Sequence, residues 1–278
     1  MTEFDMSPLH HSITERGLPH GHDGLLCDLD GVVYAGAGAV SGAVEALNLL
    51  HEAGIAVGYV TNNASRSEEQ VAEHLRSLGV TVNAQEVFGS AAAGVRLLAE
   101  QCPPPARVLV VGSAHLRESV RHAGYVLVTS AHERPDAVIQ GFDPALGWAD
   151  LAEASYAVAA GAVWVATNLD TSIPRAEGVA PGNGSLVHAV HLATGQHPHA
   201  AGKPAPHLFR TAAEALQLQR PLVVGDRLDT DIRGGNAAGF DTALVLTGIN
   251  TAEDAAAADP ADQPGWVHAD LPALLAGS

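Results

Sequence analysis

Two aspartates separated by a single residue follow a short apolar segment near the start of the chain. Residues 25–27 predict a buried strand that runs into Asp28, and Asp30 and Gly31 come directly after it. On an extended segment, side chains two residues apart point the same way at about 6–7 Å, so two such carboxylates repel unless a cation lies beside them. Clustered oxygen ligands of this kind suit Mg²⁺. The alternative for an isolated Asp-x-Asp-Gly is an ordinary turn at the end of a strand.

Polar residues also follow two further apolar segments. Thr61, Asn62 and Asn63 come after a second predicted strand, and Asp226 comes after a third. In open parallel sheets, ligands bind beyond the carboxyl ends of the strands, so we expect all these residues to share one site. A hydroxyl, amides and backbone N–H groups before a helix can hold an anion, although turns and helix caps use the same residue types. Asp226 would add a third carboxylate to the metal site.

Lys203 is the only lysine of the chain, beside thirteen arginines. A compact ammonium fits where a planar guanidinium does not, so this lysine is interpreted as chosen for its shape. It lies between Gly202 and Pro204 at the start of a predicted helix, where a cation is unfavourable for the helix itself. Lys203 is therefore predicted to pair with phosphate and to shield the carboxylates. Chance retention of a surface lysine is the alternative.

Two more aspartates follow Asp226 within a few residues. Asp231 falls in the first turn of a helix that Thr230 is expected to cap, and the first turn favours acidic residues. We interpret Asp231 as a residue that supports the metal ligands, and Asp229 as a cap or a surface charge.

Segments with the periods of strands and helices alternate from Gly24 onward, which predicts an α/β fold with parallel sheets covered on both faces. The alternation repeats independently in the middle of the chain. We therefore predict a Rossmann-like core domain, residues 23–90 and 191–278, interrupted by an inserted smaller α/β domain at 91–190. Residues 1–22 show no steady period and are predicted to be a flexible leader. This leader contains His10, His11, His20 and His22.

The composition excludes several classes of partner. A net charge of −17 argues against nucleic acid or an anionic membrane surface, because both require clustered cations. No apolar run approaches the roughly 20 residues of a membrane span. Only Cys27 and Cys102 are present, so no disulfide framework is implied and a reducing, cytoplasmic location is expected. The same acidity means that a phosphate ester needs local positive charge in order to bind.

Taken in order along the chain, these segments resemble the four motifs of the haloacid-dehalogenase-like (HAD) hydrolases, and more narrowly the nitrophenylphosphatase and phosphoglycolate-phosphatase-like branch. The resemblance covers residues 24–250. It rests on Asp28-Leu29-Asp30-Gly31-Val32-Val33-Tyr34, Thr61-Asn62-Asn63, Gly202-Lys203-Pro204, and Gly225-Asp226-Arg227-Leu228-Asp229-Thr230-Asp231.

The resemblance implies a role for each motif. Asp28 would attack phosphorus and become aspartyl-phosphate, and Asp30 would protonate the leaving oxygen and then activate water. Mg²⁺ would be held by the Asp28 carboxylate, the Asp30 backbone carbonyl and Asp226. The phosphoryl oxygens would be held by Thr61, Asn62, Asn63 and Lys203. The implied activity is hydrolysis of a small phosphorylated metabolite of the phosphoglycolate, glycerol phosphate or sugar phosphate class.

The inserted domain would be a cap over the site, which excludes water and selects the substrate. It contains Asn168 and Asp170 at the end of a predicted strand, and these are candidates for substrate specificity. A polar turn is the alternative for both. Caps in the family that the chain resembles commonly mediate dimers, so a homodimer through the cap is a further expectation.

Three other functions are consistent with parts of the pattern. A phosphomutase of the same superfamily would use the same residues and release little free phosphate. A non-catalytic module that binds phosphometabolites would use the anion site, although mere binding does not need two clustered aspartates. A nucleotide-binding reductase is suggested only by isolated glycines such as Gly112, because no full Gly-x-Gly-x-x-Gly follows.

Overall fold

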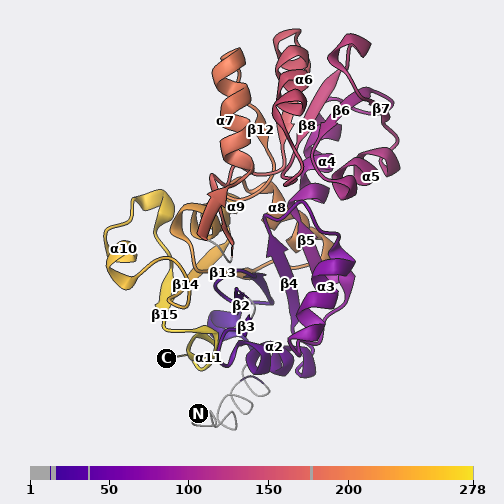
Figure 1. Cartoon of the computed structure of the whole chain (residues 1–278). Helices are drawn as coiled ribbons and strands as arrows, with labels where there is room; N and C mark the ends of the chain where they lie inside the picture. The colour runs from indigo at the N-terminus through magenta and orange to yellow at the C-terminus, as the bar shows by residue number, and fades with distance from the viewer. Residues whose placement is uncertain (1–12, 14–16, 37, 176–177, 278) are drawn as a thin grey trace. The chain divides into compact units, whose positions relative to one another are not determined.

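The computed structural model describes residues 13, 17–36, 38–175 and 178–277, and they form two compact units (Figure 1). The first unit comprises residues 1–61, 68–88 and 204–278, and the second comprises 62–67 and 89–203. Residues 191–203, which the sequence analysis assigned to the core, cluster with the second unit. The reason is that the strand His199–Ala200 pairs with that unit's sheet.

The described part of the first unit contains a six-stranded sheet in the order β15-β14-β13-β1-β4-β5. Strands β1, β4, β13, β14 and β15 run parallel, which confirms the predicted α/β class. The strand bounds are β1 Gly24–Asp28, β4 Ala56–Thr61, β5 Val87–Gly89, β13 Pro221–Gly225, β14 Asp241–Val245 and β15 Trp266–His268. A small antiparallel pair, β2 Tyr34–Ala35 and β3 Gly38–Ala39, follows β1.

Helices cover both faces of this sheet. Alternate residues of β1 point to opposite faces: Leu25 and Cys27 join a core with α2, α3 and α11, and Leu26 lies beside Gly58 on the other face with α8. All strand residues from Gly24 to Asp28 are buried, as expected of a central parallel strand. The helix bounds are α2 Ala43–Glu52, α3 Glu68–Ser77, α8 His207–Ala215, α9 Arg233–Ala238, α10 Ala252–Ala256 and α11 Leu271–Leu275. Short 3₁₀ turns lie at η1 Pro19–Gly21, η2 Ala84–Glu86 and η5 Pro260–Asp262, and η4 Leu228–Ile232 is a π-helical turn.

The second unit has its own parallel sheet, in the order β12-β9-β8-β6-β7. The strand bounds are β6 Arg107–Val111, β7 Val126–Val128, β8 Ala137–Gln140, β9 Val163–Ala166 and β12 His199–Ala200. An antiparallel hairpin follows β9, with strands β10 Ser172–Arg175 and β11 Gly178–Pro181. The helices are α4 Ser90–Gln101, α5 Ala114–His122, α6 Trp148–Ala159 and α7 Asn183–Thr194, with a 3₁₀ turn η3 Ala131–Glu133.

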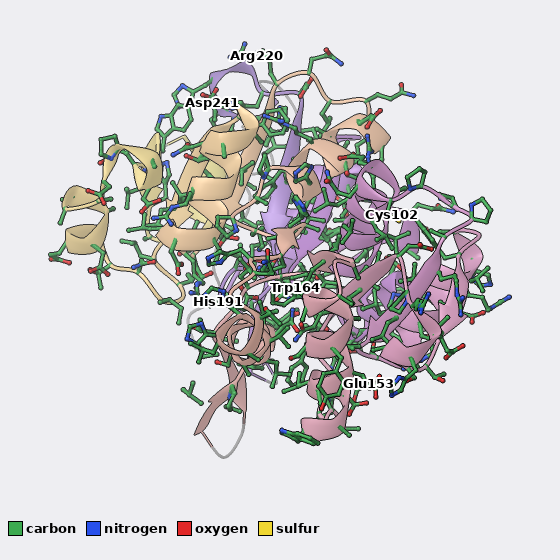
Figure 2. All side chains as sticks on the ribbon, turned by 90° about the horizontal axis from the view of Figure 1, so that it is seen from above. Cys102, Glu153, Trp164, His191, Arg220 and Asp241 are labelled. Atoms are coloured by element: carbon green, nitrogen blue, oxygen red, sulfur yellow. The ribbon has the colours of Figure 1, made fainter. Side chains whose placement is uncertain are left out.

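The described part of the predicted leader packs against the first unit. Ile13 and Leu18 belong to its core cluster, at 2% and 3% exposure. The Nδ1 of His22 lies 2.6 Å from the carbonyl oxygen of Pro19, and its Nε2 lies 3.0 Å from Oδ2 of Asp241, which is labelled in Figure 2. Residues 17–22 are therefore anchored by burial and polar contacts. The remaining predicted leader residues, with His10 and His11, lie outside the described residues.

Among the described residues, no helix combines the length and the apolar composition that a bilayer crossing requires.

Candidate active site

Three aspartate side chains converge at the carboxyl end of the first unit's sheet. Asp28 is the last residue of β1, Asp226 follows β13 directly, and Asp231 lies in the π-helical turn η4. One carboxylate oxygen of each lies within 4.8 Å of those of the other two. All three residues are buried, at 7%, 2% and 1% exposure. Three carboxylates this close repel one another strongly unless a cation is bound, so the donor set fits a hard divalent ion such as Mg²⁺.

The register of the sheet explains why these residues meet. In the pairing of β1 with β13, Cys27 lies opposite Val224, so that Asp28 lies level with Gly225, one residue before Asp226. On the other side, Asp28 pairs with Val60, and Thr61 is the next residue of β4. Parallel strands therefore bring these side chains to one edge of the sheet, as the sequence predicted.

Asp226 is held by a loop that the sequence analysis did not identify. Its Oδ2 accepts a hydrogen bond of 2.8 Å from the backbone N–H of Ile249, in the loop after β14. A side chain at Gly248 would overlap Asp226, with its Cβ 2.5 Å from Cγ. The hydroxyl of Thr247 donates to the carbonyl oxygen of Gly31 at 2.6 Å and so ties the same loop to the turn after β1. The sequence could have indicated this loop, because β14 is a further strand whose carboxyl end lies at this edge of the sheet.

Asp231 lies closer to the other carboxylates than predicted, because the helix that contains it begins differently. We expected Thr230 to cap a helix, and that expectation is wrong: Thr230 lies inside η4, which continues into α9. The wider π turn places Asp231 against Gly225, where a Cβ would lie 2.5 Å from Asp231 Oδ2. The same Oδ2 accepts a hydrogen bond of 3.2 Å from the backbone N–H of Arg227.

Asp229 turns to the surface instead. Its carboxylate accepts hydrogen bonds from the Arg227 guanidinium at 3.0 and 2.8 Å, and this contact holds the pKa of Asp229 below its usual value. Asp229 is thus a paired surface charge, in keeping with its interpretation from the sequence.

Asp30 lies two residues beyond Asp28 and is exposed. The hydroxyl of Tyr34 donates to its Oδ2 at 3.5 Å, and the backbone of Asp30 bridges to that of Tyr34. Within the described residues, the third carboxylate of the buried cluster comes from Asp231 and not from Asp30. The side chain of Asp30 is thus open to solvent, whereas those of the three clustered aspartates are buried.

Gly31 shows how tightly the turn after β1 packs against Asp226. Its φ of +85° favours glycine, and a Cβ on it would lie 2.6 Å from Cγ of Asp226. We expect Gly31→Ala to displace Asp226 and to lower Mg²⁺ affinity at least about tenfold, because metal sites depend on ligand placement. Isothermal titration with Mg²⁺ measures this. Gly36→Ala is the matched control, since Gly36 has φ +62° but open space around it. Equal Mg²⁺ affinity of the two variants would contradict the expectation.

The residues predicted to bind phosphate fall into different surroundings. Thr61 is buried at the end of β4, at 3% exposure. The Oδ1 of Asn63 accepts hydrogen bonds from the backbone N–H and the hydroxyl of Ser65, at 2.8 and 2.7 Å, which makes a local turn. Asn62 and Lys203 belong to the second unit, where the side-chain amide of Asn62 bonds to the main chain of Lys203.

Asn168 and Asp170, the candidates for substrate specificity, form hydrogen bonds with Asn62 in the second unit. The side chain of Asn168 donates to the carbonyl oxygen of Asn62 at 2.7 Å. The carboxylate of Asp170 accepts from the side chain of Asn62 at 2.9 and 3.1 Å. These contacts join the end of β9 to the segment that follows β4.

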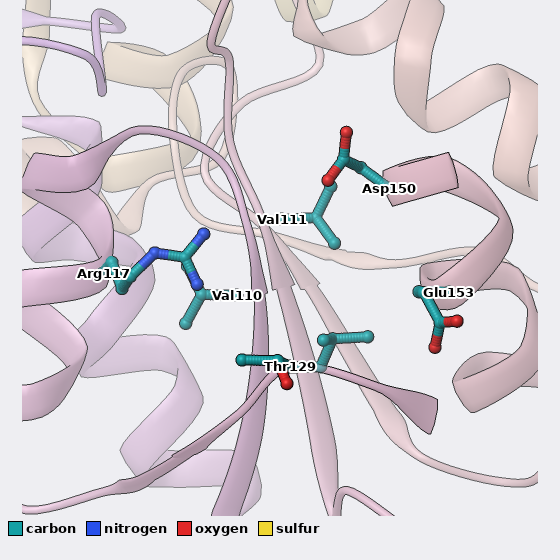
Figure 3. Close-up of a pocket in the computed structure, with 7 residues that line it drawn as sticks. Val110, Val111, Arg117, Thr129, Asp150 and Glu153 are labelled. Carbon is teal, nitrogen blue, oxygen red and sulfur yellow. The ribbon is translucent and has the colours of Figure 1, made fainter. Parts of the chain in front are cut away.

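A separate pocket of about 200 Å³ lies within the second unit (Figure 3). It is lined by the end of β6 and by Arg117, Thr129, Asp150 and Glu153. Asp150 and Glu153 accept hydrogen bonds from backbone N–H groups, at 2.9 Å from Gly147 and 2.5 Å from Ala131. The pocket contains none of the residues predicted from the sequence to bind phosphate or metal.

Comparison with known proteins places the chain in a family. A family model described as haloacid dehalogenase-like hydrolase matches residues 25–126, and a second described as HAD-hydrolase-like matches residues 200–274. D-glycerol 3-phosphate phosphatase from Mycobacterium tuberculosis is 47% identical over 259 residues, which cover 93% of this chain and 72% of that protein. Acid sugar phosphatase from Staphylococcus aureus is 39% identical, over 82% of this chain and 88% of that protein.

Solved structures agree with this result. Glycerol phosphate phosphatase from Mycobacterium tuberculosis, in complex with magnesium, superposes with a TM-score of 0.87 at 48% identity, over 91% of this chain and 76% of that chain. The same protein was also solved in complex with calcium. The p-nitrophenyl phosphatase from Archaeoglobus fulgidus has a TM-score of 0.83 at 31% identity, over 91% of this chain and 98% of that chain. The chain therefore belongs to the haloacid dehalogenase-like hydrolase family, and within it to the phosphatases.

Proposed function

We propose that this phosphatase is Mg²⁺-dependent and hydrolyses a small phosphorylated metabolite through an aspartyl-phosphate on Asp28. The observation that carries the proposal is the buried cluster of Asp28, Asp226 and Asp231, whose carboxylate oxygens lie within 4.8 Å of one another. Its donors are all oxygens, which suit Mg²⁺, and the mycobacterial relative was solved with magnesium. Bound Mg²⁺ would neutralise these carboxylates and the charge of the phosphoryl oxygens. The Asp30 backbone carbonyl would complete the protein ligands, with Asp231 supporting them.

The chain's own residues account for the two halves of the reaction. A carboxylate oxygen of Asp28 attacks phosphorus, the ester P–O bond breaks, and Asp30 gives its proton to the leaving oxygen. Water then attacks phosphorus, Asp30 takes the proton of that water, and the bond between Asp28 and phosphorus breaks to release inorganic phosphate. Thr61 and Lys203 hold the phosphoryl oxygens, with backbone N–H groups of Asn62 and Asn63. Phosphoryl transfer depends on this positioning more than on unusual side-chain chemistry.

The relatives and the charge of the chain support the proposed substrate class. The named relatives act on glycerol phosphate or sugar phosphates, which supports a small, polar phosphate ester for this chain. With a net charge of −17, the protein repels anions in general, so binding must rely on local cations. We place the enzyme in the cytoplasm, in keeping with its two cysteines, which form no disulfide in the described structure.

A homodimer through the second unit stays a prediction. Exposed apolar side chains on two adjacent helices of that unit are compatible with it: Trp148 and Tyr156 on α6, and Leu192 on α7.

A screen for phosphate release tests the proposal. The purified chain is assayed with glycerol phosphate, sugar phosphates, phosphoglycolate, nucleoside monophosphates and an aryl phosphate, each with Mg²⁺ and with EDTA. We expect release from one or more of the small esters, and a loss of at least about 10³-fold on chelation, because the metal supplies several kcal/mol of charge stabilisation. Isomerisation of a sugar phosphate without phosphate release would instead indicate a mutase. Binding without turnover would indicate a non-catalytic module.

A further inference from the structure

The side-chain amide of Asn62 forms hydrogen bonds with both main-chain polar groups of Lys203, the N–H and the carbonyl oxygen. The backbone N–H of Lys203 donates to Oδ1 of Asn62 at 2.8 Å, and Nδ2 of Asn62 donates to the carbonyl oxygen of Lys203 at 3.1 Å. The two residues are 141 positions apart in the chain. One amide thus fixes the backbone from which the only lysine extends.

Asp170 favours the same orientation of that amide as the main chain of Lys203 does. The Nδ2 of Asn62 also donates to Oδ1 and Oδ2 of Asp170, at 2.9 and 3.1 Å. An ionised carboxylate only accepts hydrogen bonds, so the NH₂ end of the amide must face Asp170. The oxygen of the amide is then left to face the N–H of Lys203. In the opposite orientation the NH₂ group would face the Lys203 N–H, and the amide oxygen would face both the Lys203 carbonyl oxygen and the Asp170 carboxylate, so Asp170 adds to the cost of that orientation.

The partners of this contact are themselves fixed within the second unit. The carbonyl oxygen of Asn62 accepts from the hydroxyl of Ser90 at 2.6 Å and from Nδ2 of Asn168 at 2.7 Å. The carbonyl oxygen of Asp170 accepts from the N–H of Gly184 at 2.8 Å. There is no space for a side chain at Gly202, where a Cβ would lie 2.7 Å from Oδ1 of Asn62. Asn62 and Asp170 are therefore held in place by further hydrogen bonds and by close packing.

We propose that Asp170 is a positioning residue for Lys203 and acts through Asn62, because its carboxylate strengthens the orientation in which the amide binds the Lys203 main chain. This inference rests on the proposed role of Lys203 in binding phosphate. It differs from the expectation that Asp170 selects the substrate, and it is supported by the hydrogen bonds that both oxygens of the carboxylate accept from Asn62. Asn168, two residues before Asp170, supports the same arrangement, since its Oδ1 accepts from the N–H of Asp170 at 3.2 Å.

The single lysine gives this proposal a direct readout. Protein labelled with ¹³C at the lysine Cε shows one side-chain lysine resonance, which belongs to Lys203. We expect inorganic phosphate with Mg²⁺ to shift that resonance in the wild type. In Asp170→Ala, we expect the midpoint of the phosphate titration to rise at least about tenfold, the usual cost of removing a residue that orients a site. Asp170→Asn keeps an acceptor opposite Asn62 and is expected to fall between the two.

Asp150→Ala is the matched control, because the Asp150 carboxylate accepts a hydrogen bond from the backbone N–H of Gly147 in the second unit and makes no contact with Asn62 or Lys203 in the described structure. Its phosphate titration should match the wild type. Melting temperatures of all variants show that the fold is retained. If the midpoint of the phosphate titration in Asp170→Ala equals that of the wild type, the positioning role alone is overturned. If phosphate does not shift the lysine resonance of the wild type, both this role and the proposed function of Lys203 are overturned.

Discussion

Replacement of Asp28 by asparagine is expected to abolish phosphate release without unfolding the protein. An amide is a poor nucleophile toward phosphorus and a weaker Mg²⁺ ligand than a carboxylate, so Mg²⁺-dependent turnover should fall by about 10³-fold or more. Asp28 is one of three carboxylates within 4.8 Å. Removal of its charge relieves repulsion in the metal-free protein, so the melting temperature in EDTA should not fall. Phosphate-release kinetics and thermal melts measure the two effects.

Asp229→Asn is the matched control for this experiment. It removes one carboxylate from the segment that also contains Asp231, but Asp229 is exposed and paired with Arg227. Exposed ion pairs contribute about 0–1 kcal/mol to stability, so the fold should be kept. Because Asp229 lies outside the carboxylate cluster, turnover should stay close to that of the wild type. Activity of Asp28→Asn equal to that of the Asp229→Asn control would remove Asp28 from the role of nucleophile.

Exchange of Lys203 for arginine is the second change with a large expected effect. The charge is kept, but the planar guanidinium is wider and directs its donors as a fork, whereas the ammonium is a compact point charge. The main chain of Lys203 is held at both polar groups by Asn62, so the backbone cannot shift to compensate. We expect kcat to fall about 10²-fold, the usual cost of losing one donor to the reacting group.

Arg117→Lys makes the reverse exchange in the same unit and serves as its control, because Arg117 lies at a pocket apart from the predicted site residues. Steady-state kinetics of both variants with one small phosphate ester separate kcat from KM. Unchanged kcat in Lys203→Arg would show that the charge alone matters and that the single lysine was retained without regard to its shape.

Much of the fold could be predicted because its signals are local. The strand predicted at residues 25–27 is observed as β1, Gly24–Asp28, since a short apolar run beside turn residues identifies a buried strand. The sequence also predicts that Asp28, Thr61 and Asp226 lie at strand ends, and the observed ends of β1, β4 and β13 bring Asp28 and Asp226 to one edge of the sheet. The rule that ligands bind beyond the carboxyl ends of parallel strands requires only the sequence of each strand and a parallel sheet.

The parts that the sequence did not predict depend on contacts between distant residues. The loop at Thr247 and Ile249 meets Asp226 through a backbone N–H, and a backbone group leaves no signature in the side-chain pattern. Asn62 and Asp170 meet across 108 positions, and a polar residue after a strand looks the same whether it faces a substrate or another side chain. Leu18 is buried against the core although its neighbours in the sequence show no period.

A crystal structure of the chain grown with Mg²⁺ and beryllium trifluoride tests the central claim most directly, because this fluoride mimics a phosphoryl group on a carboxylate. The account predicts a beryllium adduct on the Asp28 carboxylate, with one Mg²⁺ bound between Asp28 and Asp226 and supported by Asp231. An adduct on another residue, or an ion bound away from these carboxylates, would contradict it.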